Sequence, residues 1–258
     1  MKDYSDDFYR HRDATTRHSA ERIVPLVLDL VPARSVVDVG CGVGTWLSIF
    51  LRHGVPEVRG YEGTWLDPSR LVVAREFVTQ GDLQVPINAG RRFDLAMSLE
   101  LAEHLPAACA PGFVESLTRL APAVLFSAAI PGQGGTHHVN EQWPRYWIDL
   151  FAPHGFLAID CIRAAVWQDE QVLWWYAQNT FLMVHRDLLE STPSLRRARE
   201  QAPTMPLNLV HPGHLLSKCA AMTRLREEVP SLRRSFQSLG ASLKRAVIQR
   251  VPGFHSRP

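Results

Sequence analysis

The chain has few cysteines, no paired cysteine motif and no long hydrophobic run. Of its 258 residues, 46% are hydrophobic and 21% are charged, which is typical of a protein that folds in water. No apolar stretch approaches the ~20 residues of a membrane-spanning helix, and the polar first residues, MKDYSDDFYRHRDATTRHSAER, do not resemble a secretory signal peptide. The four cysteines lie far apart, which argues against a zinc knuckle or a disulfide framework and predicts a cytoplasmic protein.

Charge is distributed unevenly along the chain. From Arg196 onward there are 12 Lys or Arg residues against 3 Asp or Glu, so this part carries a net charge of +9 and residues 1–195 carry −7. Residues 190–212 are rich in Ser, Pro and Arg, a composition that favours a linker. We therefore predict one domain over residues 1–189, a linker over 190–212 and a basic helical extension over 213–258.

The extension has the pattern of an amphipathic helix interrupted at Gly240. Its apolar positions, spaced by three or four, are Leu232, Phe236, Leu239, Leu243 and Val247. This pattern predicts packing on a partner subunit, as in a homodimer, or on the chain's own domain. The alternative is contact with a membrane surface or another anionic surface. Sequence-specific binding of nucleic acid is not expected, because no aromatic side chains alternate with the basic ones.

Strand and helix patterns alternate through the predicted domain. Strands are predicted at 34–40, 57–63, 92–100, 123–132, 156–167 and 178–186, and helices at 18–31, 45–54, 109–121 and 143–155. Residues 71–82 fit either a helix or a strand. Because strands that alternate with helices build βαβ units, the pattern predicts an α/β fold with a mostly parallel sheet covered on both faces. The last two strands are expected to form an antiparallel pair.

A glycine-rich segment, VVDVGCGVGTW, lies where the first predicted strand meets its helix, with glycines at Gly40, Gly42 and Gly44. Ligands of parallel sheets bind at the carboxyl ends of strands, where glycine lets the backbone approach them closely. No Gly-Lys-Ser/Thr follows, which excludes a phosphate-binding P-loop. Asp38 precedes the glycines, and Glu62, at the end of the next strand, can accept hydrogen bonds from both hydroxyls of a ribose. The segment therefore predicts an adenosyl ligand, the alternative being a tight turn without one.

The segment VVDVGCGVGTWL resembles the first motif of the class I S-adenosylmethionine-dependent methyltransferases, and the resemblance extends over about residues 20–187. GYEG resembles the end of the family's second strand, although Asp is the usual residue there. TQGDL resembles the loop that lies by the adenine amino group, and FDLAMSLELAEHLP resembles the fourth-strand motif. The resemblance implies a Rossmann-like seven-stranded sheet and S-adenosylmethionine as cofactor. A nicotinamide-dependent enzyme is the main competitor, but its Gly-x-Gly-x-x-Gly places the third glycine one residue later.

The resemblance also implies a set of cofactor-binding residues. Asp38 would position the amino group of the methionine part, the glycines would border that part, and Asp82 would lie by the adenine. The full set is Asp38, Gly40, Cys41, Gly42, Gly44, Glu62, Gly63, Asp82, Leu83 and Leu99.

Two histidine-bearing segments follow the fourth and fifth predicted strands. Methyl transfer from a sulfonium needs alignment of donor and acceptor and, for a hydroxyl acceptor, a group that takes up its proton. ELAEHL supplies Glu100, Glu103 and His104, and THHVNEQW supplies His137 and His138. These loops should face each other because the two strands are neighbours in this topology. The spacing of Glu100 and His104 would place both on one face of a helical turn.

Three interpretations of these residues stay open. His104 or His138 could be a general base near neutral pH. Alternatively, Glu100, Glu103, His104 and one of the two later histidines could bind a divalent metal, as in RNA 3′-end methyltransferases. In the third interpretation these residues only shape the pocket. We predict His104, His138 and Glu100 as catalytic residues, with a metal allowed but not favoured.

The segment GGTHHVNEQWPRYWIDLFAPHGF is similar to a subgroup of bacterial methyltransferases found with glycosyltransferases and natural-product genes. That subgroup usually reads Gly-His-Val-Asn-Glu-Gln-Trp, so His138 matches and His137 departs from the pattern. Trp143, Tyr146 and Trp147 could line a sugar or ring, or anchor the following helix in the core. The predicted substrate-binding residues are Glu103, His137, Asn140, Trp143 and Trp147.

These observations predict a methyltransferase that acts on a hydroxyl group of a sugar, a glycan precursor or a small natural product. A metal-dependent RNA 3′-terminal ribose 2′-O-methyltransferase is the first alternative. A non-catalytic protein that binds S-adenosylmethionine is the second.

Overall fold

The computed structural model describes residues 6–203 and 205–225. They belong to two compact units, Met1–His211 and Pro212–Pro258. Within the described residues no helix combines the length and the apolar character needed to cross a membrane. All four cysteines are free thiols.

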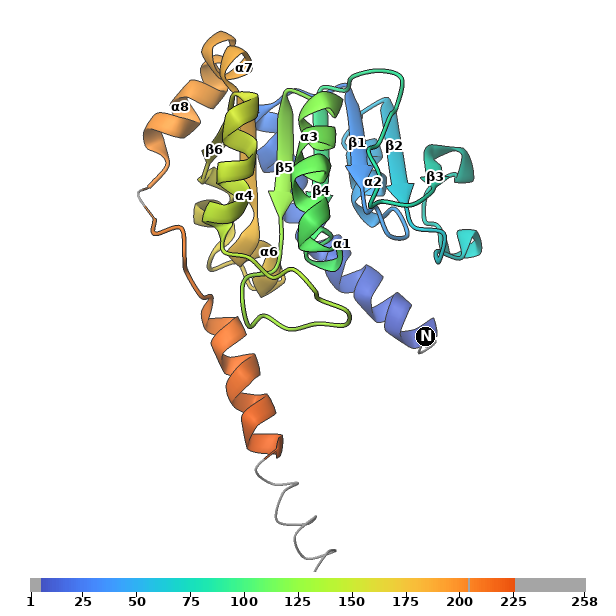
Figure 1. Cartoon of the computed structure of the whole chain (residues 1–258), viewed down its shortest axis with the longest axis vertical. Helices are drawn as coiled ribbons and strands as arrows, with labels where there is room; N and C mark the ends of the chain where they lie inside the picture. The colour runs from blue at the N-terminus through green and yellow to red at the C-terminus, as the bar shows by residue number, and fades with distance from the viewer. Residues whose placement is uncertain (1–5, 204, 226–258) are drawn as a thin grey trace, which may run out of the picture. The chain divides into compact units, whose positions relative to one another are not determined.

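The first unit contains one seven-stranded sheet (Figure 1). Its strands are β1 (Ser35–Val39), β2 (Glu57–Glu62), β3 (Val78–Gln80), β4 (Leu95–Leu99), β5 (Ala123–Ser127), β6 (Phe156–Ile159) and β7 (Phe181–His185). They are ordered β3-β2-β1-β4-β5-β7-β6. Strands β1 to β5 are parallel, and β7 runs antiparallel to both β5 and β6. Every residue of β1, β4 and β5 is buried, as expected for central strands covered on both faces.

Helices cover both faces of this sheet. One face carries α1 (Asp6–Leu30), α2 (Thr45–Arg52), α5 (Cys161–Val166), α6 (Trp174–Asn179), α7 (Arg186–Ser191) and α8 (Pro193–Gln201). The other carries α3 (Ala110–Leu120) and α4 (Pro144–Phe151). In Figure 1, α3 and α4 lie in front of the sheet and α1 emerges from behind it. Short 3₁₀ turns occur at Pro68–Arg70, Arg75–Phe77, Ala102–His104, Ala107–Cys109 and Ala152–His154. The seven-stranded Rossmann-like fold predicted from the sequence is confirmed.

One segment settles a choice that the sequence left open, and two others differ from the prediction. Residues 71–82 contain the short strand β3 and no α-helix. The predicted strand 156–167 ends at Ile159, and its second half is α5, because Ile162 and Val166, four residues apart, are both buried in the same core. Within residues 190–212, predicted as a linker, the structure has α8, whose Leu195 is fully buried while its arginines stay exposed.

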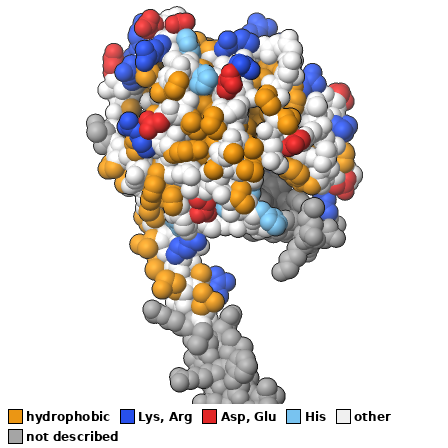
Figure 2. All heavy atoms as spheres, in the orientation of Figure 1, with side chains coloured by type: hydrophobic (Ala, Val, Ile, Leu, Met, Phe, Trp, Pro, Cys, Tyr) orange, Lys and Arg blue, Asp and Glu red, His pale blue; other side chains and the backbone are white. Residues whose placement is uncertain are grey.

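The described part of the second unit is one helix over residues 212–225. Leu215, Leu216, Met222 and Leu225 are exposed on it, and Figure 2 shows hydrophobic and basic side chains along this helix. The predicted amphipathic pattern from Leu232 to Val247 lies outside the described residues.

The loops that carry the predicted site all lie at one edge of the sheet. Strands β1, β2, β4 and β5 end at this edge, which we call the carboxyl edge and which is at the bottom of Figure 1. The strand order reverses between β1 and β4, since β2 and β3 lie on one side of β1 and β4 and β5 on the other. Such a reversal opens a crevice for a ligand outside the carboxyl ends of the strands.

Candidate active site

The glycine loop after β1 has three left-handed glycines with different roles. The φ angles of Gly40, Gly42 and Gly44 are 85°, 54° and 86°. A Cβ on Gly40 would lie 2.7 Å from the side chain of Leu101, and one on Gly44 would lie 2.6 Å from that of Val73. A Cβ on Gly42 would meet no atom within 4 Å. Packing therefore requires Gly40 and Gly44, whereas Gly42 borders open space in which a ligand can contact the backbone.

The buried carboxylate of Glu62 bridges the loops after β1 and β2. One oxygen, Oε2, accepts a hydrogen bond from the Gly42 N–H at 2.6 Å, and Oε1 accepts one from the Gly63 N–H at 2.7 Å. A carboxylate oxygen has two lone pairs and can accept more than one hydrogen bond, which is the acceptor chemistry that a ribose hydroxyl requires.

Asp38 lies in β1, one residue before its end, and only 2% of its surface is exposed. Burial, and then the nearby negative charge of Glu62, raise the pKa of Asp38 well above its usual value. A cationic ligand beside Asp38 would offset this cost. Two buried carboxyl groups next to the open backbone of Gly42 therefore fit S-adenosylmethionine, which carries a cationic amino group, a cationic sulfonium and a ribose.

The other predicted cofactor residues occupy varied positions. Asp82 is exposed, and its carboxylate accepts a hydrogen bond from the Gln84 N–H at 2.9 Å. Leu83, Leu99 and Cys41 are buried. The Leu99 side chain belongs to the core on the α1 face and that of Leu83 to the core on the α3 face.

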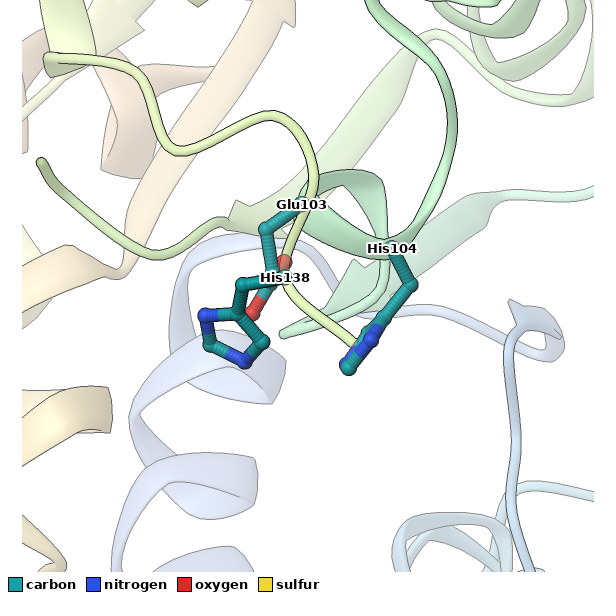
Figure 3. Close-up of side chains that lie close together, drawn as sticks. All are labelled: Glu103, His104 and His138. Atoms are coloured by element: carbon teal, nitrogen blue, oxygen red, sulfur yellow. The ribbon is translucent and has the colours of Figure 1, made fainter. Parts of the chain in front are cut away.

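The two histidine-bearing loops face each other as predicted. Glu103 and His104 lie in the 3₁₀ turn after β4, and His138 lies in the loop after β5. Their side chains converge (Figure 3), with one ligand atom of each lying within 4.8 Å of the others. The two imidazole rings meet edge to face with centroids 4.8 Å apart. The N–H groups of Val139 and Asn140 donate to the Glu103 carbonyl at 2.9 and 3.0 Å, which joins the loops.

His138 is paired with a carboxylate. Its Nδ1 lies 2.9 Å from Oε1 of Glu141, which also accepts hydrogen bonds from the N–H groups of Gly134, at 2.6 Å to Oε1, and Gly132, at 2.7 Å to Oε2. Desolvation raises the pKa of Glu141, but the hydrogen bonds from His138, Gly134 and Gly132 outweigh it and lower that pKa. An ionised Glu141 favours the tautomer with the proton on Nδ1, which leaves Nε2 as the basic nitrogen.

His104 lies beside a backbone carbonyl of the facing loop. Its Nδ1 lies 3.3 Å from the backbone carbonyl of His137. His137 itself is exposed and has a positive φ of 62°. A carboxylate polarises an imidazole more than a neutral carbonyl does, and Glu141 gives His138 such a partner.

The carboxyl group of Glu103 is fully buried, and within the described part of the chain neither oxygen has a partner at full hydrogen-bond geometry, although the backbone N–H groups of Glu103 and Ala129 lie close enough to offset part of the rise in its pKa. Burial, and then the nearby Glu100, raise the pKa of Glu103 well above its usual value. Since an ionised carboxylate without partners is costly to bury, this group is either neutral or neutralised by a cation.

The predicted pairing of Glu100 with His104 on one helical turn is wrong. Glu100 precedes the turn and has a positive φ of 53°. Its Oε2 accepts a hydrogen bond from Gln133 at 2.8 Å and its Oε1 accepts one from Asn179 at 3.0 Å. The N–H of Glu100 donates to the carbonyl and the hydroxyl of Ser127, at 3.1 and 3.0 Å. Glu100 is therefore held by the loop after β5 and the end of α6, and it is not one of the three residues whose ligand atoms converge, although its charge acts on Glu103.

One predicted substrate-binding residue belongs to the core. Trp147 is 2% exposed and its ring lies 5.3 Å from that of Phe126, so it anchors α4 against the sheet. Trp143, directly before α4, is only half-buried and remains a candidate to contact an acceptor. Asn140 is buried, and its Oδ1 accepts a hydrogen bond from Gln142 at 3.0 Å.

Sequence reasoning missed three residues that organise this site. Glu141 lies three residues after His138 within the quoted motif, and this spacing was an available signal. Gln133 and Asn179 lie 46 positions apart and meet only because β7 inserts next to β5. No local sequence pattern indicates such a contact.

A seven-stranded sheet of this order, with a glycine loop after β1 and an acidic residue ending β2, defines the Rossmann-like class of methyltransferases. The chain belongs to a family described as a methyltransferase domain, and the match to this family covers residues 9–180. It is an S-adenosylmethionine-dependent methyltransferase. No curated protein sequence matches it.

Two solved structures illustrate the shared fold. The sugar N-methyltransferase of a Streptoalloteichus species is 19% identical, with a TM-score of 0.52 over 72% of this chain and 94% of that one. An amino pentose methyltransferase from Micromonospora echinaspora, involved in calicheamicin biosynthesis and solved with S-adenosylmethionine, is 17% identical, with a TM-score of 0.50 over 72% of this chain and 99% of that one.

Proposed function

We propose that this methyltransferase acts on a hydroxyl group of a sugar, a glycan precursor or a small natural product, and that His138 is its general base. The observation that carries the proposal is the pairing of His138 with the ionised Glu141 at the carboxyl edge. The resemblance of residues 134–143 to bacterial methyltransferases that accompany glycosyltransferases supports a glycan-related acceptor. The sugar and the amino pentose named for the two solved structures are in keeping with a sugar acceptor, although the first of these proteins is an N-methyltransferase.

The residues of the chain divide the work between binding and proton transfer. When bound, S-adenosylmethionine supplies an electrophilic methyl group on its sulfonium. Glu62 would hold the ribose, the backbone of Gly42 would border the methionine part, and Asp38 would position its amino group. Nε2 of His138 would take the proton of the acceptor hydroxyl as that oxygen receives the methyl group supplied by the cofactor. Glu141 holds the ring in one tautomer and stabilises the imidazolium that forms.

The test is a methyl-transfer assay with the full chain, methyl-labelled donor and a panel of matched acceptors. Each sugar in the panel is offered with a hydroxyl or with an amino group at the same position, and products are identified by mass spectrometry. Transfer to hydroxyl acceptors is expected. Transfer to amines alone, or to no hydroxyl acceptor in the panel, would contradict the proposal.

A metal-dependent reaction is the second candidate, because Glu103, His104 and His138 place one oxygen and two nitrogens within 4.8 Å of one another. These are ligand types that suit a divalent metal. Of the four residues predicted for such a site, Glu100 lies outside this group. The corresponding function is 2′-O-methylation of an RNA 3′-terminal ribose.

Chelator titration separates the two candidates. The base mechanism predicts a methyl-transfer rate that is unchanged after dialysis against a chelator. The metal mechanism predicts loss of activity, restored by adding back Mg²⁺, Mn²⁺ or Zn²⁺, together with turnover of a short RNA 3′ end.

A further inference from the structure

The segment 205–211, the last part of the first unit, is held against the rest of that unit by a buried arginine. Arg163 of α5 is fully buried and donates hydrogen bonds to the carbonyls of Pro206 and Leu207, both at 3.1 Å. Its guanidinium also pairs with Asp160 and lies 4.3 Å from the centre of the Phe181 ring. Because a buried guanidinium needs its partners, detaching this segment would leave two of its hydrogen bonds unmade.

The last residue of this segment, His211, is fixed by its backbone and its ring. Its N–H donates to Oε1 of Gln178 at 2.9 Å. Its Nε2 lies 2.8 Å from the carbonyl of Trp167, whose ring it meets edge to face at 4.8 Å. Both ends of the segment 205–211 are therefore held by the methyltransferase domain.

Gln178 connects this docked segment to the active site. Its buried Nε2 donates to Oδ1 of Asn179 at 3.0 Å and to Oε1 of Gln133 at 3.3 Å. Asn179 Nδ2 donates to Gln133 Oε1 at 2.9 Å and to Glu100 at 3.0 Å. Turning the amide of Gln178 around would set its oxygen against two other oxygens. The network thus defines one orientation, in which the Gln178 oxygen must face the His211 N–H.

The same network supports the histidine loop. Gln133 lies between Gly132 and Gly134, whose N–H groups bind Glu141, the partner of His138. Fixing the side chain of Gln133 therefore fixes the backbone that holds the Glu141 carboxylate. A continuous series of hydrogen bonds leads from residue 211 through Gln178 and Gln133 to both Glu100 and this loop.

We propose that Gln178 is a positioning residue for methyl transfer, and that the docked segment 205–211 keeps it in place, so that the junction with the C-terminal unit supports the active site from a distance. The inference rests on the proposed function, since it assumes that Glu100 and the loop after β5 lie at the acceptor side. In this arrangement Gln178 contacts neither donor nor acceptor and acts only through Gln133 and Asn179.

A matched pair of variants tests the link at residue 211. His211→Pro deletes the N–H that binds Gln178, and His211→Ala keeps this N–H while removing the ring from Trp167. Relative to His211→Ala, we expect His211→Pro to lower kcat on the order of tenfold, with the affinity for S-adenosylmethionine unchanged. Equal kcat values in the two variants would overturn the proposal.

A double-mutant cycle distinguishes positioning from general stability. Gln178→Met alone should lower kcat, but it should lower it far less in a Glu100→Gln background, because the effect passes through the network that holds Glu100. Effects that simply multiply would show that Gln178 acts independently of this network. Thermal unfolding of each variant confirms that only folded protein is compared.

Amide hydrogen exchange gives a readout that needs no acceptor. In the full chain, His211→Pro but not His211→Ala should increase exchange at Ile130 and at residues 132–134. If this increase is seen while the wild-type chain methylates none of the acceptors tested, the proposed function fails and the structural link stands. If exchange is the same in both variants, the link fails whatever the acceptor is.

Discussion

Replacing His138 by alanine tests the proposed base most directly. The variant removes the imidazole but keeps the hydrogen bonds from Gly132 and Gly134 to Glu141, so the loop retains its main support. The side chains of His138 and Glu141 are only 12% and 19% exposed, so solvent screens their interaction little. Loss of a positioned general base lowers a rate by about 10²- to 10⁴-fold, which corresponds to about 3–5 kcal/mol of activation free energy.

The assay compares kcat at saturating S-adenosylmethionine and measures the affinity for the demethylated cofactor by calorimetry. We expect kcat and kcat/KM for the acceptor to fall together, because proton transfer occurs only in the transition state, while the cofactor affinity stays the same. His137→Asn is the matched control. It changes the neighbouring exposed histidine, and asparagine tolerates the left-handed backbone of that position.

Glu141→Gln should have an intermediate effect. A neutral amide offers one acceptor oxygen to three donors and no charge to an imidazolium, so kcat should fall by about 10- to 100-fold. A His138→Ala protein that binds cofactor normally and turns over at the wild-type rate would refute the assignment of the base. A Glu141→Gln protein as slow as His138→Ala would instead show that the ring loses its function entirely without the carboxylate.

Three further predictions concern the cofactor loop, a buried acid and the core. Gly42→Ala should weaken cofactor binding in calorimetry and lower stability by only about 1–2 kcal/mol, because its backbone is left-handed. Gly44→Ala should destabilise the fold more strongly, since its Cβ would lie 2.6 Å from a neighbouring side chain. Because the folded-state pKa of Glu103 is raised, the wild-type protein should lose stability as the pH rises from about 4.5 through that pKa. Thermal unfolding measured in the presence of a chelator should show a weaker pH dependence for Glu103→Gln. Trp147→Ala should lower the free energy of unfolding in denaturant by about 3–5 kcal/mol and leave the cofactor affinity unchanged. A folded Trp147→Ala protein that binds the acceptor much more weakly would show that Trp147 contacts the acceptor.

The central strands were predictable because their signal is local. The run Ser35–Val39 is apolar and β-branched apart from its first residue and Asp38, and it ends before a glycine with a positive φ, so both the strand and its end can be read from neighbouring residues. The sequence predicts one strand over residues 156–167, because short apolar runs do not distinguish a strand from a buried helix. There, burial of Ile162 and Val166 in one core decides for a helix.

Parts of the site followed from position in the sequence. Asp38, Gly42 and Glu62 were expected at the ends of the first two strands, and the structure brings them together because parallel strands end at a common edge. The meeting of His104 and His138 followed in the same way from the neighbouring strands β4 and β5. The prediction that Glu100 shares a helical face with His104 is wrong, because helical spacing does not extend across a residue whose backbone is left-handed.

The sequence by itself determined the fold class, the cofactor and the two loops that carry the histidines, because these depend on hydrophobic periodicity, glycine positions and strand order. Only the tertiary structure decided the environment of each side chain. It paired Glu141 with His138, buried the carboxyl group of Glu103, turned Glu100 toward Asn179, 79 positions away, and placed Trp147 in the core. Hydrogen-bond partners and burial depend on contacts between distant segments, and these arise only when the sheet and its two helical layers are assembled.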